Sequence, residues 1–224
     1  MINKKNHLYI MILILLSCFI MAWIDGVLSP NYAIKSIIKL FLFLMIPFGY
    51  YYYHQITLYN LFRFRKQNIL FSLLLGIGVY FFIIGAYFTI GKYFDFSNVT
   101  TTLEDKIGVT KNNFVFVSLY ISFINSFLEE FFFRGFAFLT LKQFTTKKIS
   151  YMFSASAFSL YHIAIMSKWF TPLLFVLLII SLFIAGLLFN WLNEKSNTIY
   201  TSWFVHMCAN FSINTIGFIL FGIL

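Results

Sequence analysis

Long uninterrupted runs of apolar residues alternate with short polar segments along the whole chain. Each run has roughly 20 residues, the length that an α-helix needs to cross a hydrocarbon layer about 30 Å thick. The runs lack the period-2 alternation of barrel strands, so helices are expected. The runs cover residues 8–28, 33–53, 69–91, 114–141, 149–166, 171–192 and 198–221. The pattern therefore predicts an all-α, polytopic membrane protein with about seven transmembrane helices.

The composition supports the same fold class. Hydrophobic residues make up 61% of the chain and charged residues only 10%, whereas a soluble domain has about 25% charged residues. The net charge of +9 comes from Lys and Arg residues that fall mostly in short connections between apolar runs. A nucleic-acid site would need them clustered on one solvated face. We therefore expect a lipid bilayer, and no nucleic acid, as a partner.

The basic residues also predict an orientation in the membrane. If seven spans alternate, most of these residues fall on one side, which the positive-inside rule makes cytoplasmic. They are Lys4, Lys5, Arg63, Arg65, Lys66, Lys142, Lys147, Lys148 and Lys195. Lys35 and Lys39 are placed at the outer end of the second span, where they weaken the bias without reversing it. The N-terminus is expected inside.

Three charged residues interrupt the otherwise apolar fourth span: Glu129, Glu130 and Arg134. A charge at the centre of a spanning helix costs about 2.5–3.5 kcal/mol on insertion scales, and it usually marks function or a required partner. Glu130 and Arg134 are four residues apart, so they share a helix face and can form an ion pair. Glu129 points about 100° away around the helix, which leaves its carboxylate available to another helix. It is the preferred chemical residue.

Two later spans carry polar residues at comparable depth. His162 lies in the fifth span, and His206 and Asn210 lie four residues apart on one face of the seventh span. Counted from the predicted inner boundary, these residues and Glu129 lie about 12–20 Å inside the membrane. We expect them to meet in one pocket.

A carboxylate and a neutral imidazole around one water molecule can generate a nucleophile, and a second imidazole with an amide N–H can stabilise an oxyanion. This combination favours peptide hydrolysis. Three alternatives stay open: polar contacts that only hold helices together, a proton relay in a proton-coupled transporter, and a catalytically silent immunity or binding protein. Related halves or paired broken helices, which many transporters show, are not evident in the sequence.

The three motifs together resemble a known family. Glu-Glu-x-x-x-Arg, then Phe-x-x-x-His, then His-x-x-x-Asn, in this order on membrane helices, are similar to the CAAX protease and bacteriocin-processing enzyme (CPBP or Abi) family of intramembrane endopeptidases, which is related to type II CAAX prenyl endopeptidases. The matching residues are Glu129, Glu130, Arg134, Phe158, His162, His206 and Asn210. The resemblance covers roughly residues 113–215. It implies variable N-terminal helices over residues 1–112 and a catalytic helical core over residues 113–224, within one membrane domain.

The resemblance also implies roles for these residues. Glu129 and His162 would activate the attacking water, and His206 and Asn210 would form the oxyanion site. The residues that would support the pocket are Glu130, Arg134 and Phe158.

The sequence leaves metal dependence open. Glu129, His162 and His206 are plausible zinc ligands, because catalytic zinc commonly has three protein ligands and a water. The chain lacks the His-Glu-x-x-His pair of soluble zinc proteases, which favours a glutamate-activated water and leaves a bound divalent metal such as zinc unproved.

The expected substrate is a membrane-associated peptide or protein. Eukaryotic members of the family trim prenylated C-terminal tails, and many bacterial members act in bacteriocin maturation, peptide signalling or self-immunity. The richness in Ile, Lys, Asn, Phe and Tyr is typical of an AT-rich bacterial genome. It favours the bacterial group and a location in the plasma membrane.

Overall fold

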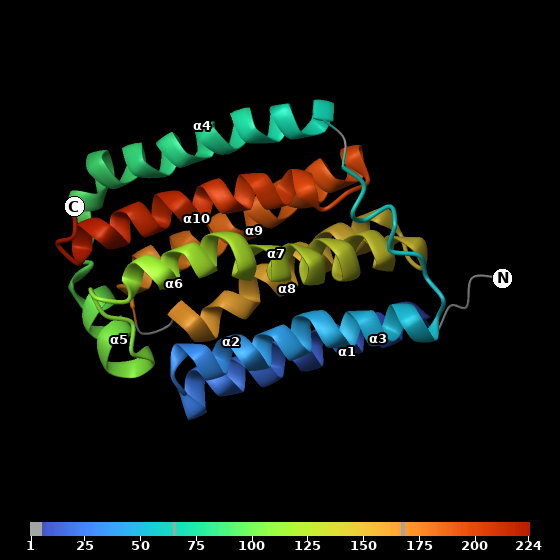
Figure 1. Ribbon diagram of the computed structural model, residues 1–224, viewed down its shortest axis with the longest axis horizontal. Coiled ribbons are helices and arrows are strands. Elements are labelled where there is room, and N and C mark those ends of the chain that lie inside the picture. The colour runs from blue at the N-terminus through green and yellow to red at the C-terminus, as the bar shows by residue number, and fades with distance from the viewer. Residues whose placement is uncertain (1–5, 65, 167–168) are drawn as a thin grey trace.

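The computed structural model describes residues 6–64, 66–166 and 169–224, and every regular element in these ranges is helical. Within them, seven helices are long and apolar enough to cross a membrane, and they pack side by side (Figure 1). These spans are Asn6–Leu28, Tyr32–Tyr53, Asn68–Tyr93, Phe114–Gln143, Lys147–Met166, Pro172–Ser196 and Tyr200–Leu220. The all-α fold with seven spans is therefore confirmed, and the ends agree with the predicted runs to within a few residues.

Three of the spans contain π-helical turns, which the periodicity did not predict. The first span consists of α1 (Asn6–Trp23) and η1 (Ile24–Leu28), and the second of α2 (Tyr32–Leu40), η2 (Phe41–Met45) and α3 (Ile46–Tyr53). The fourth consists of α6 (Phe114–Tyr120), η4 (Ile121–Asn125), α7 (Ser126–Glu129), η5 (Glu130–Thr140) and the short 3₁₀ turn η6 (Leu141–Gln143). The remaining spans are α4 (Lys66–Ile90) with the 3₁₀ turn η3 (Gly91–Tyr93), α8 (Lys147–Met166), α9 (Pro172–Ser196) and α10 (Tyr200–Leu220). Glu129 and Glu130 lie where α7 gives way to a π-helix, a feature often found at functional sites.

The connection between the third and fourth spans contains a short helix that the sequence analysis did not predict. This helix, α5 (Ser97–Ile107), ends at Gly108, which has φ +69°. The Gly108 and Val109 amides donate to the carbonyls of Glu104 and Leu103, respectively. Glycine suits this position because it adopts the left-handed conformation without steric cost.

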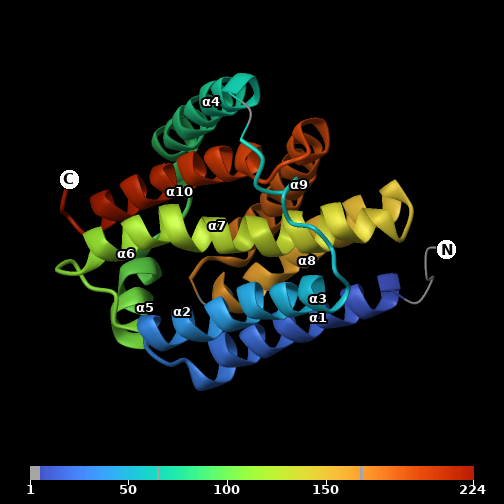
Figure 2. The ribbon, with the colours of Figure 1, turned by 45° about the vertical axis from the view of Figure 1, so that its right-hand side comes forward.

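The fourth span lies in the middle of the bundle (Figure 2). It has α10 on one side, with α4 outside α10, and the first two spans on the other side (Figures 1 and 2). Helices α8 and α9 also contact η5, and every residue of η5 is buried. Glu129, Glu130 and Arg134 are therefore enclosed by protein rather than lipid.

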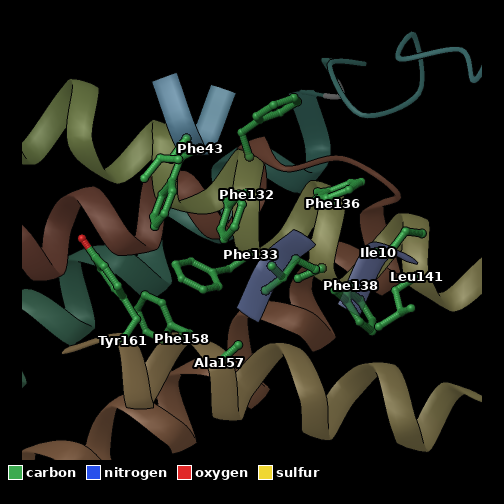
Figure 3. Close-up of a cluster of buried hydrophobic side chains, with 14 of the residues drawn as sticks. Ile10, Phe43, Phe132, Phe133, Phe136, Phe138, Leu141, Ala157, Phe158 and Tyr161 are labelled. Carbon is green, nitrogen blue, oxygen red and sulfur yellow. The ribbon is translucent and has the colours of Figure 1, made fainter. Parts of the chain in front are cut away.

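Aromatic rings join the second span to the fourth. Phe43 stacks on Phe132 with ring centroids 4.0 Å apart and meets Phe133 edge-on at 5.5 Å, as Figure 3 shows. Such pairs contribute about 0.5–1.5 kcal/mol each beyond their buried area. Nearby, a hydrogen bond of 2.8 Å joins the hydroxyls of Tyr51 and Thr140. The second span is thus held beside the fourth along much of its length.

The two lysines of the second span do not act as surface charges. Lys35 pairs with Asp25 at 2.9 Å across the turn between the first two spans. Lys39, expected at the outer end of the span, is buried: its side chain is 8% exposed and turns into the bundle toward the Glu129 carboxylate. The inward orientation of the N-terminus stays a prediction, since Lys4, Lys5 and Arg65, on which it partly rests, lie outside the described residues.

Close approach of α4 and α10 requires a glycine at position 76. A Cβ atom on Gly76 would lie 2.8 Å from Cys208 Sγ and 3.3 Å from the Phe204 carbonyl oxygen, whereas one on Gly78 would have no neighbour within 4 Å. We expect Gly76→Ala to lower the free energy of unfolding by about 1–3 kcal/mol through overpacking. Gly78→Ala, the matched control on the same helix, should not lower it. Titration with SDS followed by circular dichroism measures both; equal effects would contradict the close packing.

Candidate active site

Glu129 lies at the end of α7 and is 3% exposed. Its Oε2 atom is 4.0 Å from Nε2 of His162 on α8 and 3.6 Å from Nε2 of His206 on α10. These separations are too long for direct hydrogen bonds, but they allow one water molecule to bridge the groups. Three different spans therefore bring one carboxylate oxygen and two imidazole nitrogens to the same place.

The other oxygen of this carboxylate is held from the opposite side. Glu129 Oε1 accepts a hydrogen bond of 2.5 Å from Nζ of Lys39 on α2 and one of 3.1 Å from Nδ2 of Asn125. Lys39 also donates to Oδ1 of Asn125 at 2.6 Å. The carboxylate is thus anchored through one oxygen and faces the two histidines with the other.

Glu130 positions His206. Its Oε1 atom is 2.9 Å from Nδ1 of His206, and its Oε2 atom accepts a hydrogen bond from the Ser202 hydroxyl. Because an ionised carboxylate can only accept, Nδ1 of His206 carries the proton of this bond. The Nε2 atom, which faces Glu129, then carries a lone pair when the ring is neutral.

His162 is oriented by the backbone of its own helix. Its Nδ1 atom is 2.7 Å from the Phe158 carbonyl oxygen. A carbonyl oxygen can only accept, so this nitrogen carries the proton and Nε2 of the neutral ring is free to accept one. The main-chain carbonyl of Phe158 thus sets the tautomer of His162. The Phe158 ring also meets the imidazole edge-on, with ring centroids 4.8 Å apart.

Arg134 compensates the charge of Glu130 in a fully buried position. Its Nε atom is 3.5 Å from Glu130 Oε2, and its guanidinium lies 4.2 Å from the ring centroid of Phe158 and 5.1 Å from that of Phe189. A cation over desolvated aromatic faces gains about 2 kcal/mol or more. The ion pair and these rings together keep a guanidinium in the apolar interior.

Asn210 lies one turn beyond His206 on α10. Its Nδ2 atom donates at 3.2 Å to the carbonyl oxygen of Ile121, the first residue of the π-helical turn that ends at Asn125. Among the described residues, no hydrogen bond joins Asn210 to Glu129, His162 or His206. Its second amide hydrogen is not used by this contact.

Three residues around the carboxylates were not predicted from the sequence: Lys39, Asn125 and Ser202. Lys39 carries a detectable signal, because it is a charged residue inside an apolar run, as Glu129 is. Asn125 precedes Glu129 by four residues and so shares its side of the helix. Ser202 has no such signal, since serine is common in membrane helices.

The residues at this site do not fit a metal ion. Within the described ranges, no group of three or more His, Cys, Asp and Glu side chains has a geometry that could hold one. The Lys39 ammonium already neutralises Glu129 at 2.5 Å, and it would repel a second cation at the same carboxylate. The charges of the cluster balance without a metal: Lys39 faces Glu129, and Arg134 faces Glu130.

The fold and the buried charges define an integral membrane protein with a polar site enclosed between its spans. Residues 111–212, which contain all seven motif positions, match the family described as type II CAAX prenyl endopeptidase Rce1-like. This segment of the chain is similar to that family, in agreement with the resemblance that its motifs show to the CAAX protease group. Neither curated proteins nor solved structures gave a match to the chain.

Proposed function

We propose that this protein is an intramembrane endopeptidase that hydrolyses a peptide bond of a membrane-associated peptide or protein with a water molecule activated by Glu129 and His162. The observation that carries the proposal is the convergence of Glu129 Oε2 with the Nε2 atoms of two histidines inside the bundle. An ionised carboxylate and a neutral imidazole can each accept a proton from water, so both are suitable general bases.

In this mechanism the water donates one hydrogen bond to Glu129 Oε2 and one to His162 Nε2. Its oxygen attacks the carbonyl carbon of the peptide bond while Glu129 takes the proton. The resulting tetrahedral intermediate collapses, the C–N bond breaks, and Glu129 passes the proton to the leaving amine. One peptide and one water thus give a carboxylic acid and an amine.

Two residues of α10, Asn210 and His206, are the proposed donors that stabilise the oxyanion of the tetrahedral intermediate. Asn210 has an unused amide hydrogen, and His206 can donate from Nε2 when its ring is charged, with Nδ1 held by Glu130. A removed oxyanion donor typically costs about 10²–10³ in kcat.

The experiment that tests the proposal is cleavage of a peptide library by the protein in liposomes, carried out in ¹⁸O-labelled water and followed by mass spectrometry. The library includes free and prenylated C-terminal peptides. We expect new termini with one ¹⁸O atom in the carboxyl group of the N-terminal product. No new termini, with the protein folded by circular dichroism, would favour the silent binding protein or the proton-coupled transporter.

We predict that chelators leave this cleavage unchanged. The physical reason is that Lys39, rather than a metal, neutralises Glu129. Cleavage rates are compared with and without 1,10-phenanthroline. A zinc protease in the same liposomes is the control, because it should lose activity when the chelator removes its zinc. Loss of cleavage that added zinc restores would contradict the prediction and assign a metal to Glu129, His162 and His206.

The proposed hydrolysis would serve one of several biological roles. Maturation of a bacteriocin or signalling peptide, self-immunity, and CAAX-like removal of a C-terminal tail all require hydrolysis at the membrane, and a bacterial plasma membrane suits the composition of the chain. The prenylated and unprenylated members of the library separate these substrates, because only tail processing requires the prenyl group.

A further inference from the structure

Lys39 is a buried lysine that lies outside residues 111–212 and still reaches the centre of the site. It belongs to α2, in the second span, and is 6% exposed. A charged lysine inside a membrane span is costly, so it requires a compensating partner. The partner is Glu129, on the fourth span.

The contacts of Lys39 are specific rather than incidental. Its ammonium donates to Glu129 Oε1 at 2.5 Å and to Asn125 Oδ1 at 2.6 Å, and it lies 4.9 Å from the ring centroid of Tyr161 and 5.3 Å from that of Phe43. Asn125 in turn donates to the same carboxylate oxygen. Lysine and asparagine therefore fix both the charge and the rotation of the carboxylate.

The two carboxylate oxygens consequently have different surroundings. Oε1 accepts from Lys39 and Asn125, whereas Oε2 faces His162 and His206. A base needs an ionised oxygen directed at the water, and a buried carboxylate without a cation would instead take up a proton. Lys39 meets this need without blocking the oxygen that the reaction uses.

We propose that Lys39 is a positioning residue: it holds Glu129 ionised in the bilayer and directs Oε2 toward His162 and His206. The proposal rests on the proposed function for its effect on catalysis. The charge and rotation of Glu129 are properties of the resting protein, so they can be tested without any substrate.

The first experiment therefore measures the protonation of Glu129 directly. A hydrophobic carbodiimide reacts with protonated carboxyl groups within membranes, and mass spectrometry locates the adduct. At neutral pH we expect little labelling of Glu129 in the wild type and at least tenfold more in Lys39→Met and Lys39→Gln. Glutamine retains a hydrogen-bond donor without the charge, so it separates charge from contact. Strong labelling of Glu129 in the wild type, or equal labelling in all three proteins, would overturn the proposal even if no variant folds as well as the wild type.

The second experiment measures kinetics with a peptide that the wild type cleaves. We expect Lys39→Met to lower kcat about 100-fold and leave KM within about threefold, because the group acts on the reacting base rather than on substrate binding. Lys39→Arg, which keeps the charge, should recover part of kcat. Lys35→Met is the matched control, because Lys35 lies one helical turn before Lys39 and its ammonium pairs with Asp25 instead of Glu129. This variant should keep the wild-type kcat. Equal losses in Lys39→Met and Lys39→Arg would overturn the charge argument.

The two experiments separate the two proposals. If the wild type cleaves no peptide but Glu129 becomes labelled only after Lys39 is replaced, the proposed function fails and the positioning role stands. If cleavage occurs and labelling is the same with or without Lys39, the function stands and the positioning role fails.

Discussion

Glu129→Gln is expected to lower kcat/KM for peptide hydrolysis by about 10²–10⁴, the range that a positioned general base contributes. Glutamine keeps the shape of the side chain and an oxygen that can accept from Lys39 and Asn125, but it cannot take a proton from water. Mass spectrometry of products formed in liposomes, with equal amounts of folded protein, measures the loss.

The matched control for this variant is Glu194→Gln. Glu194 is also a carboxylate that pairs with lysines, Lys142 at 3.3 Å and Lys147 at 2.7 Å, but it lies near the C-terminal end of α9. Among the described residues, no hydrogen bond or ion pair joins it to the proposed catalytic residues. Its replacement should leave the cleavage rate unchanged. Wild-type cleavage by Glu129→Gln would assign the base to another group and remove the main support for the proposed mechanism.

Arg134→Met is expected to lower the free energy of unfolding by about 3–5 kcal/mol, because it leaves the Glu130 carboxylate buried without its cation. Arg134 is fully buried, and its guanidinium also contacts Phe158 and Phe189. Titration with SDS in mixed micelles measures this free energy, and loss of the folded protein on purification would be the extreme form of the same result.

The double variant Glu130→Gln with Arg134→Met tests whether the loss comes from the unpaired charge. Glutamine at position 130 can still accept from Ser202 and contact His206, and no uncompensated charge remains. We expect the double variant to be more stable than Arg134→Met alone. Additive losses from the two single changes would show that Arg134 stabilises the bundle through its aromatic contacts rather than through Glu130.

The fold was largely predictable because its signals are local. The length of an apolar run decides whether a helix can cross the bilayer, and each run can be counted without knowing its neighbours. The π-helical turns and α5 were not predictable in the same way. A π-helical turn inserts one residue into an otherwise regular helix without changing its apolar composition, and α5 is a short polar helix whose formation depends on its cap at Gly108.

The site was predictable in part. Glu129, His162 and His206 were recognisable because polar residues in apolar spans are costly and the three lie at similar depth. The structure brings these three together, but it directs one amide hydrogen of Asn210 to the Ile121 carbonyl. It also adds Lys39, which had been counted only among the basic residues at the outer end of the second span.

By itself, the sequence determined that this is a helical membrane protein of seven spans, with two carboxylates, an arginine and two histidines inside it. Apolar length and the cost of burying a charge are properties of each segment, so both can be read along the chain. Only the tertiary structure decided that Lys39 on the second span pairs with Glu129 on the fourth. Lipid tails are as apolar as most helix faces, so the choice of which helices meet depends on close packing and on the few polar groups that must find a partner.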